Sequence, residues 1–289
     1  EFTFITGITK FSQLSIFSAI NNLTNISMDP EFAAICGITK EEMLTQMSDD
    51  IDALAEHLEL NREETIQELK DHYDGYHFCW PSPDVFNPYS LLNCFADGRM
   101  DDYWFGSGTP TYLINMMRKY EFLPADLGEA IEVGKKDFDA PTETMTTIVP
   151  LLYQSGYVTI KGYDKPTKLY LLALPNQEIR VGLYGSLLPH YLTDKSAKAN
   201  TTIAKMSKLI NLGQLDEALL LFKTFLETVP YCDNTNYEGH YQQMMYIMFA
   251  LLTNFRILVE QHTAKGRTDI TMETHDTIYI MELKFNKTA

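Results

Sequence analysis

The hydrophobic positions in the first part of the chain recur with a helical period. Between residues 29 and 76, apolar side chains return every three or four positions, which predicts amphipathic helices with polar outer faces. Thr39 with Glu42, and Asn61 with Glu64, have the spacing of helix N-caps in which a side-chain oxygen accepts a backbone N–H. The pattern therefore predicts helices that begin just after Thr39 and Asn61.

The pattern then becomes irregular before helices return. Residues 73–110 are rich in aromatic side chains, Gly and Pro, which is typical of turns and packed loops, and a helix is predicted at Thr111–Lys119. The aromatic clustering indicates packing more readily than ligand binding. Residues 196–230 again have a helical pattern.

A helix followed by two alternating segments stands in the middle of the chain. Residues 143–154 predict the helix, and residues 157–160 and 168–175 predict a hairpin, with another helix after Pro175. This order resembles a small winged-helix unit, in which a helix and a basic wing bind DNA. Three lysines surround the wing turn: Lys161, Lys165 and Lys168. A packing module is the alternative, and we favour it because the helices lack a basic face.

The last fifty residues predict a helix, a strand and a hairpin. Residues 236–255 form a long apolar segment with Glu238 near its start, and a strand is predicted through residues 257–259. The segments GRTDITME and TIYIMELKFN alternate between apolar and polar residues around the polar turn at residues 274–277. Because a turn of this kind joins antiparallel strands, we expect the two segments to pair.

This hairpin carries the residues with the clearest chemistry. Asp269 lies on its first strand, and Glu282 and Lys284 lie two apart on its second, so the latter two share a face with Ile278 and Ile280. Two carboxylates can hold Mg²⁺ or Mn²⁺, which polarises a phosphoryl oxygen and acidifies a bound water. An amine can orient that water or offset charge that develops on the phosphate. The alternative is a solvated strand edge that has no chemical role.

The hairpin resembles the core of the PD-(D/E)XK nuclease superfamily, in which an Asp on one strand precedes an acid, any residue and Lys on the next. The resemblance implies that Asp269 and Glu282 bind the metal and that Lys284 assists catalysis. Many of these nucleases also use an acid on the preceding helix, a role that would fall to Glu238; a charge favoured by the helix dipole is the alternative. Glu260 either assists or is an exposed strand end.

Composition limits the class of protein. With 289 residues and 45% hydrophobic content, the chain predicts two or more domains with buried cores. No apolar run reaches the length of a membrane span, and four scattered cysteines suit reduced thiols, so we expect a cytoplasmic protein without membrane contact. The start, EFTFITG, has neither Met nor a signal pattern, and we expect a fragment of a longer protein.

The net charge of −16 argues against strong intrinsic affinity for nucleic acid, but the charge is uneven. Residues 1–143 hold 9 Lys and Arg against 26 Asp and Glu, whereas residues 144–289 hold 14 against 13. A nearly neutral second half can still present a local basic patch. Nucleic acid therefore remains a candidate partner of the second half.

A second resemblance covers nearly the whole chain. The segments TGITKFSQLSIFSAINNLTNIS, ICGITKEEM, YDGYHF, FNPYSLL and YWFGSGTP are similar to the AAA-ATPase-like family. Its members are commonly bacterial or archaeal proteins in which an AAA-type ATPase domain precedes a PD-(D/E)XK nuclease-like domain. A phosphate-binding Gly-rich loop is absent from the sequence, so we expect ATP binding only in the intact protein and no ATPase activity here.

Together these patterns predict a multidomain α/β and α+β chain. We expect the C-terminal part of an AAA-type domain with a helical lid in residues 1–135 and a winged-helix-like connector in residues 136–200. A restriction-endonuclease-like domain, truncated at its C-terminus, is expected in residues 201–289. The predicted function is metal-dependent phosphodiester hydrolysis coupled to an ATPase domain in the intact protein. The alternative is an inactive nuclease fold that serves as an interaction or regulatory platform.

Overall fold

The computed structural model describes residues 7, 24–105, 111–128, 130–142, 144–192, 196–227, 237–252, 256–263, 266–274 and 276–281. The chain divides into two compact units. The first consists of Glu1–Gly108, Asn115–Phe122 and Ala130–Ile179, and the second of Thr109–Ile114, Leu123–Glu129 and Arg180–Ala289. The domain boundaries expected after residues 135 and 200 stay predictions. The segment FTFITG and the helix that follows it lie outside the described residues.

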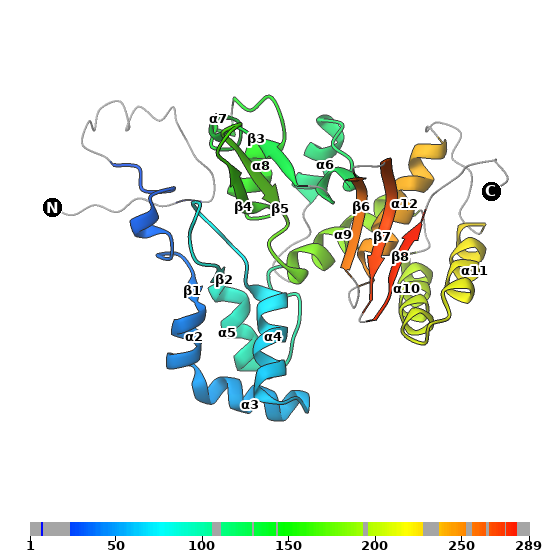
Figure 1. Ribbon diagram of the computed structural model, residues 1–289, viewed down its shortest axis with the longest axis horizontal. Coiled ribbons are helices and arrows are strands. Elements are labelled where there is room, and N and C mark those ends of the chain that lie inside the picture. Colours follow the sequence, from blue (N-terminus) through cyan, green and yellow to red (C-terminus); the bar gives the residue numbers. More distant parts are fainter. Residues whose placement is uncertain are drawn as a thin grey trace. The chain divides into compact units, whose positions relative to one another are not determined.

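Helices build one part of the first unit (Figure 1). After the short helix η1 (Pro30–Phe32) come α2 (Lys40–Gln46), α3 (Ser48–Leu58), α4 (Arg62–Tyr73) and α5 (Pro88–Asp97). The strands β1 (Ile38–Thr39) and β2 (Val85–Phe86) pair antiparallel. Both N-cap predictions are confirmed, because Thr39 with Glu42 and Asn61 with Glu64 form reciprocal capping boxes.

The helices enclose a core of side chains with almost no exposure. Its members come from α2, α3, α4, β2 and α5: Met43, Ile51, Leu54, Leu69, Tyr73, Phe86, Leu91 and Cys94. Burial of a single such side chain contributes about 1.5–3 kcal/mol, so this core accounts for much of the stability of the helical part. The acidic residues of α3 and α4 lie on the opposite, exposed faces.

A small antiparallel sheet builds the other part of the first unit. Its strands are β3 (Ile131–Val133), β4 (Thr159–Asp164) and β5 (Leu169–Ala173), in the order β3-β5-β4. The helices α7 (Lys135–Phe138) and α8 (Val149–Gln154) precede β4 and contact each other. The expected helix and hairpin are confirmed, whereas the winged-helix resemblance stays a prediction. The third strand, β3, was not predicted.

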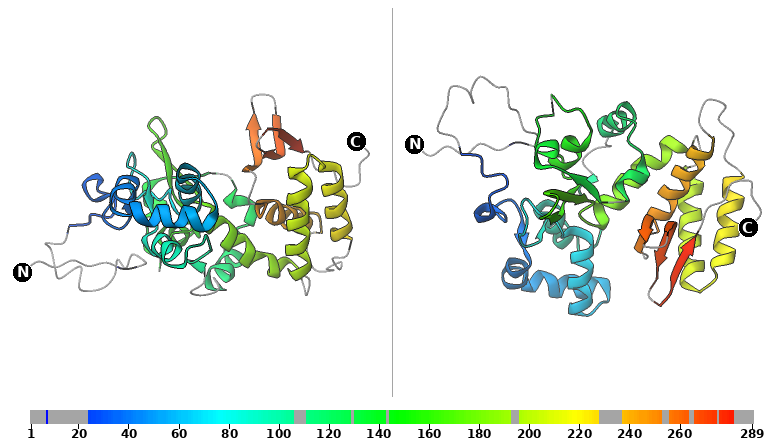
Figure 2. Two further views of the ribbon diagram at one scale, coloured as in Figure 1. Left: turned by 90° about the horizontal axis from the view of Figure 1, so that it is seen from below. Right: turned by 45° about the horizontal axis from the view of Figure 1, so that its top comes forward.

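The second unit joins helices to a three-stranded sheet (Figure 2). Two elements, α6 (Thr111–Lys119) and α9 (Gln177–Tyr191), contribute residues to both units. The others are η3 (Pro124–Leu127), α10 (Ser196–Asn211), α11 (Leu215–Leu226), α12 (Tyr237–Ala250), β6 (Arg256–Thr263), β7 (Gly266–Glu273) and β8 (Ile278–Met281). The order of the antiparallel strands is β6-β7-β8. The predicted order of helix, strand and hairpin is therefore confirmed in α12 and β6–β8.

The helix α12 anchors this unit through buried side chains. It contacts β6, α10 and η3, and Met244, Ile247 and Met248 have no exposed surface. The hydroxyls of Tyr184 and Tyr246 are hydrogen-bonded to each other at 2.8 Å, which satisfies two polar groups inside the core. No helix within the described ranges is long and apolar enough to cross a membrane.

Candidate functional site

The pairing of β7 with β8 distinguishes two faces of the C-terminal sheet. Ile270 lies opposite Met281, and Met272 lies opposite Tyr279. Because directly opposed residues point to the same side of a sheet, these four define one face. Ile270 is 2% exposed and Met272 is fully buried, so this face packs against the protein interior.

The other face is open at β8. Thr271 lies opposite Ile280, and Glu273 lies opposite Ile278. Ile278 and Ile280 are 64% and 65% exposed, although they belong to a strand with strong apolar character. The sheet therefore buries one face and leaves large apolar side chains of its last strand on the other.

The structure describes only part of the predicted metal site. Glu282 and Lys284 lie outside the described residues, and so do the side chains of Asp269 and Glu238, whose backbones belong to β7 and α12. Asp269 directly precedes Ile270, and Glu282 directly follows Met281, the partner of Ile270. Among the described side chains, no three or more His, Cys, Asp or Glu residues are placed to hold a metal ion.

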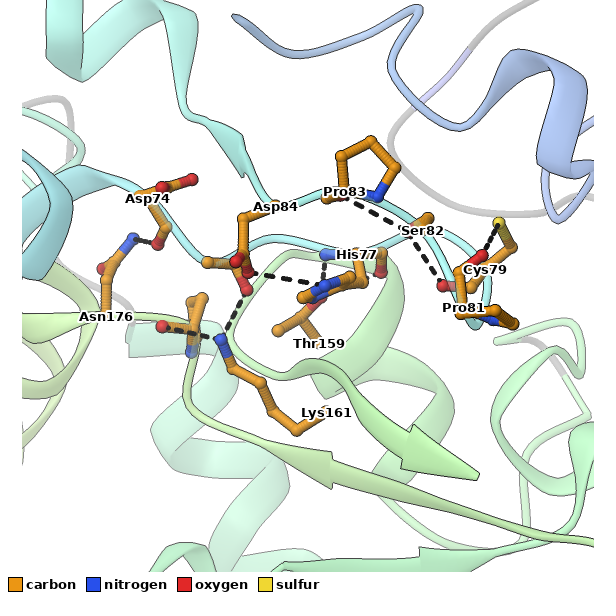
Figure 3. Close-up of polar contacts among 12 residues, drawn as sticks. Asp74, His77, Cys79, Pro81, Ser82, Pro83, Asp84, Thr159, Lys161 and Asn176 are labelled. Atoms are coloured by element: carbon orange, nitrogen blue, oxygen red, sulfur yellow. Dashed lines mark hydrogen bonds and ion pairs between the residues drawn. The ribbon is translucent and has the colours of Figure 1, made fainter. Parts of the chain in front are cut away.

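A second group of polar side chains lies in the first unit, and the sequence did not predict it. It surrounds the segment that follows α4 (Figure 3). The Lys161 ammonium donates to the carbonyl of Gly75 at 2.6 Å and to that of Pro175 at 3.1 Å. The Asn176 amide donates to the Asp74 carbonyl at 3.0 Å. These bonds fasten β4 and the segment before α9 to the end of α4.

His77 extends this cluster toward the surface. The Thr159 hydroxyl accepts the His77 backbone N–H at 2.8 Å and donates to the His77 carbonyl at 2.9 Å. The His77 Nε2 lies 3.4 Å from a carboxylate oxygen of Asp84, which is half exposed, and the ring contacts Trp80. His77 is only 6% exposed, so the surroundings of its imidazole are largely fixed by the fold.

Burial controls the ionisation of this cluster. It lowers the pKa of Lys161 and of His77, and it raises the pKa of Asp74, in each case because water is removed from the charged form. The nearby Asp84 carboxylate opposes the change at Lys161 and His77. Protonation here is set mainly by the packing of the unit.

Lys161 makes internal contacts, although the sequence placed it in a predicted basic wing. Its ammonium is engaged by backbone carbonyls, whereas Lys165 and Lys168 lie exposed in the turn between β4 and β5. The sequence feature that could have indicated this cluster is Asp74-Gly75, which directly follows the end of a helix. Gly75 has φ +95°, and an added Cβ would lie 2.6 Å from the Pro175 carbonyl oxygen, so this position requires glycine.

Comparison with known proteins gives two matches. Residues 236–289 match the PD-(D/E)XK nuclease superfamily. The chain is also 32% identical over 300 aligned residues to an uncharacterized protein in the vnfD 5′ region of Azotobacter chroococcum mcd 1. That alignment covers 98% of this chain and 54% of the relative, so the chain spans about half the relative's length. No solved structure matches significantly. The matched range contains α12 and β6–β8, and residues 236–289 are thus a domain of the PD-(D/E)XK nuclease superfamily.

Proposed function

We propose that the C-terminal domain hydrolyses phosphodiester bonds of nucleic acid with the help of Mg²⁺ or Mn²⁺. The single observation that carries the proposal is the superfamily match, which spans α12 and β6–β8. The pairing of β7 with β8 supports it. In that register Ile270 opposes Met281, and pairing continued by one residue would place Asp269 opposite Glu282.

The donor set fits such an ion. Carboxylate oxygens are the ligands that Mg²⁺ and Mn²⁺ prefer, and Asp269 and Glu282 would supply one from each of two adjacent strands. The ion, when bound, polarises a phosphoryl oxygen and acidifies a water. Lys284 would orient the attacking water and offset negative charge on the phosphate.

Two further acids are candidates for supporting roles. Glu238 lies in the first turn of α12 and would add a carboxylate from the helix. Glu260 and Asp269 stand between the paired residues Val259 with Ile270 and Gln261 with Thr268, at matching positions of β6 and β7. Glu260 would therefore assist from the strand on the other side of Asp269.

We also propose that this activity is coupled to an AAA-type ATPase domain in a longer protein. The support is the set of sequence segments similar to that family. The chain by itself would hydrolyse no ATP, because it lacks a phosphate-binding loop.

One observation favours a second function. The exposed Ile278 and Ile280 give β8 an apolar surface, which suits contact with a protein better than contact with phosphates. An inactive nuclease fold that serves as an interaction or regulatory platform would use this surface without a metal.

The test is cleavage of single- and double-stranded DNA and RNA by the full chain in Mn²⁺ or Mg²⁺. Asp269→Asn and Glu282→Gln remove the carboxylate charge at nearly constant volume. Glu273→Gln makes the same chemical change at the other end of β7, opposite the exposed Ile278, and serves as the control. Circular dichroism verifies the fold, and calorimetry measures Mn²⁺ binding.

Metal-dependent cleavage that both site variants lose and Glu273→Gln keeps would support the nuclease and its ligands together. A folded chain that neither binds Mn²⁺ nor cleaves any substrate would overturn the proposal in favour of the platform. Cleavage that survives both site variants would reject the assigned ligands.

A further inference from the structure

Glu178 is a carboxyl group enclosed by the first unit. It lies in the first turn of α9 and has no exposed surface. Its Oε1 accepts a hydrogen bond from the Ser90 hydroxyl on α5 at 2.9 Å and another from the Trp104 backbone N–H at 2.8 Å. One oxygen atom thus joins three segments that are far apart in the sequence.

The second oxygen of this carboxyl lacks comparable support. Glu178 Oε2 is buried and makes no hydrogen bond of normal geometry among the described residues, although the nearby Tyr103 backbone N–H also favours the ionised form of this carboxyl. An ionised carboxylate needs donors at both oxygens or a compensating cation when water is removed. A protonated carboxyl carries no charge and needs fewer donors, because its Oε1 still accepts hydrogen bonds as a carbonyl oxygen. The geometry therefore suits the neutral form better.

The titratable groups around Glu178 give no compensation. Asp102 exerts the strongest charge effect on it, and Tyr73, Tyr76 and Cys94 are also influenced by its charge. All four are acids, from α4, α5 and the segments that follow these helices. The first-turn position in α9 favours a negative charge only modestly, and burial outweighs it. Burial raises the pKa of Glu178 to about 7, and that of Asp102 to about 6.

We propose that Glu178 is a proton-operated latch that holds the Trp104 segment to α5 and to the start of α9. The protonated carboxyl keeps the latch closed, and ionisation admits water to Oε2 and releases the Trp104 backbone. Trp104 packs edge-on against Phe105 and Tyr157, each with ring centroids 5.0 Å apart, so release also loosens an aromatic cluster. This device is independent of the proposed nuclease site.

The direction of the pH effect follows from proton linkage. The closed state has a Glu178 pKa of about 7, whereas a water-exposed Glu has its ordinary pKa of 4.5. The closed state therefore binds the proton more tightly and is favoured at low pH. Its advantage over the open state declines as pH rises from about 4.5 to about 7, by about 300-fold in population ratio.

Tryptophan fluorescence can report on this latch alone. The chain has two tryptophans, and Trp80 contacts His77 in the other polar cluster. In a Trp80→Phe protein the emission comes from Trp104 only. We expect its emission to shift to longer wavelength as pH rises from 5 to 8.5, with a midpoint at or somewhat below pH 7, because opening exposes the indole to water.

The matched variants identify the group responsible. Glu178→Gln in the Trp80→Phe background should abolish the shift, because the amide oxygen still accepts both bonds and the side chain no longer ionises. Glu132→Gln changes an exposed carboxylate in the same way and should leave the shift intact. Ser90→Ala, which removes one donor to the carboxylate, should move the midpoint to higher pH. Asp102→Asn removes a negative charge that raises the pKa of Glu178, so it should move the midpoint to lower pH.

A flat emission profile in the Trp80→Phe protein would overturn the latch. So would a shift that persists in folded Glu178→Gln protein. If Glu178→Gln does not fold, the two midpoint variants decide the question: unchanged midpoints in both Ser90→Ala and Asp102→Asn would reject Glu178 as the titrating group.

Discussion

The hairpin β7–β8 and the cluster around Lys161 differ in how far their side chains are exposed. At Lys161, the charged group donates to the carbonyls of Gly75 and Pro175, and burial lowers its pKa. On the hairpin, the face shared by Thr271, Glu273, Ile278 and Ile280 is open at β8. One region uses polarity to hold segments together, and the other leaves a surface that a large substrate can reach.

This difference separates structural from chemical roles. A buried polar group that is held by hydrogen bonds to the protein backbone mainly joins segments of the fold, so its removal should change stability. A charged position on an open strand face contributes little to folding, so its removal should change activity. Substitutions in the two regions should therefore separate effects on stability from effects on activity.

The largest effect is expected for Lys284→Met at the proposed nuclease site. If Lys284 stabilises charge on the phosphate, its loss should reduce the cleavage rate about 10²–10³-fold, as removal of one charge-stabilising group does elsewhere. Thermal unfolding should change little. The measurement is the single-turnover cleavage rate in saturating Mn²⁺, with Lys287→Met as the control for loss of a nearby cation. A rate equal to that of the unmodified protein would exclude Lys284 from the reaction.

The next effect is on folding and comes from Gly75→Ala. The residue has φ +95°, and its new Cβ would lie 2.6 Å from the Pro175 carbonyl oxygen and 2.7 Å from Lys161 Nζ. Backbone strain and displacement of this contact together should destabilise the protein by about 3 kcal/mol. Urea unfolding gives the value.

Gly213→Ala is the matched control for this substitution. Gly213 has a similar φ of +73°, but nothing lies within 4 Å of an added Cβ. Its replacement should therefore show the conformational strain alone, about 1 kcal/mol. Equal losses of unfolding free energy in the two variants would mean that the close approach at Gly75 adds nothing to the conformational strain.

Features that depend on residues close together in the chain could be predicted from the sequence. The N-caps at Thr39 and Asn61 depend on residues three apart, and α12 and the β7–β8 hairpin depend on patterns within one segment, so all were predicted. The spacing of Asp269, Glu282 and Lys284 pointed to the PD-(D/E)XK superfamily, which residues 236–289 match, whereas the roles of these three residues stay a prediction.

The buried contacts were out of reach for a physical reason. Lys161 is 86 residues from Gly75, and Glu178 is 88 residues from Ser90 and 74 from Trp104. No local period encodes such pairs, because tertiary packing determines which distant segments meet. Lys161 therefore looked like a residue of a basic wing. The strand β3 has only three residues, too few for an alternating pattern to identify it.

A smaller effect on stability is expected for Lys161→Met. The substitution keeps the aliphatic stem and removes the ammonium, which leaves the Gly75 and Pro175 carbonyls without their donor. The expected loss is about 1–3 kcal/mol in urea unfolding. Lys165→Met, in the exposed turn of the same hairpin, should change stability by less than about 0.5 kcal/mol. Similar values for both lysines would contradict a structural role for Lys161.

The smallest effect should come from the open face of the C-terminal sheet. Ile280 is 65% exposed, so Ile280→Thr removes few packed contacts and retains a β-branched side chain suited to a strand. Stability should change by less than about 0.5 kcal/mol. Met272→Ala on the buried face of β7 should cost about 2–5 kcal/mol, because it opens a cavity at a side chain with no exposure. A large loss from Ile280→Thr would show that something covers Ile280 in solution, and the face would then be an interface, as the platform alternative requires.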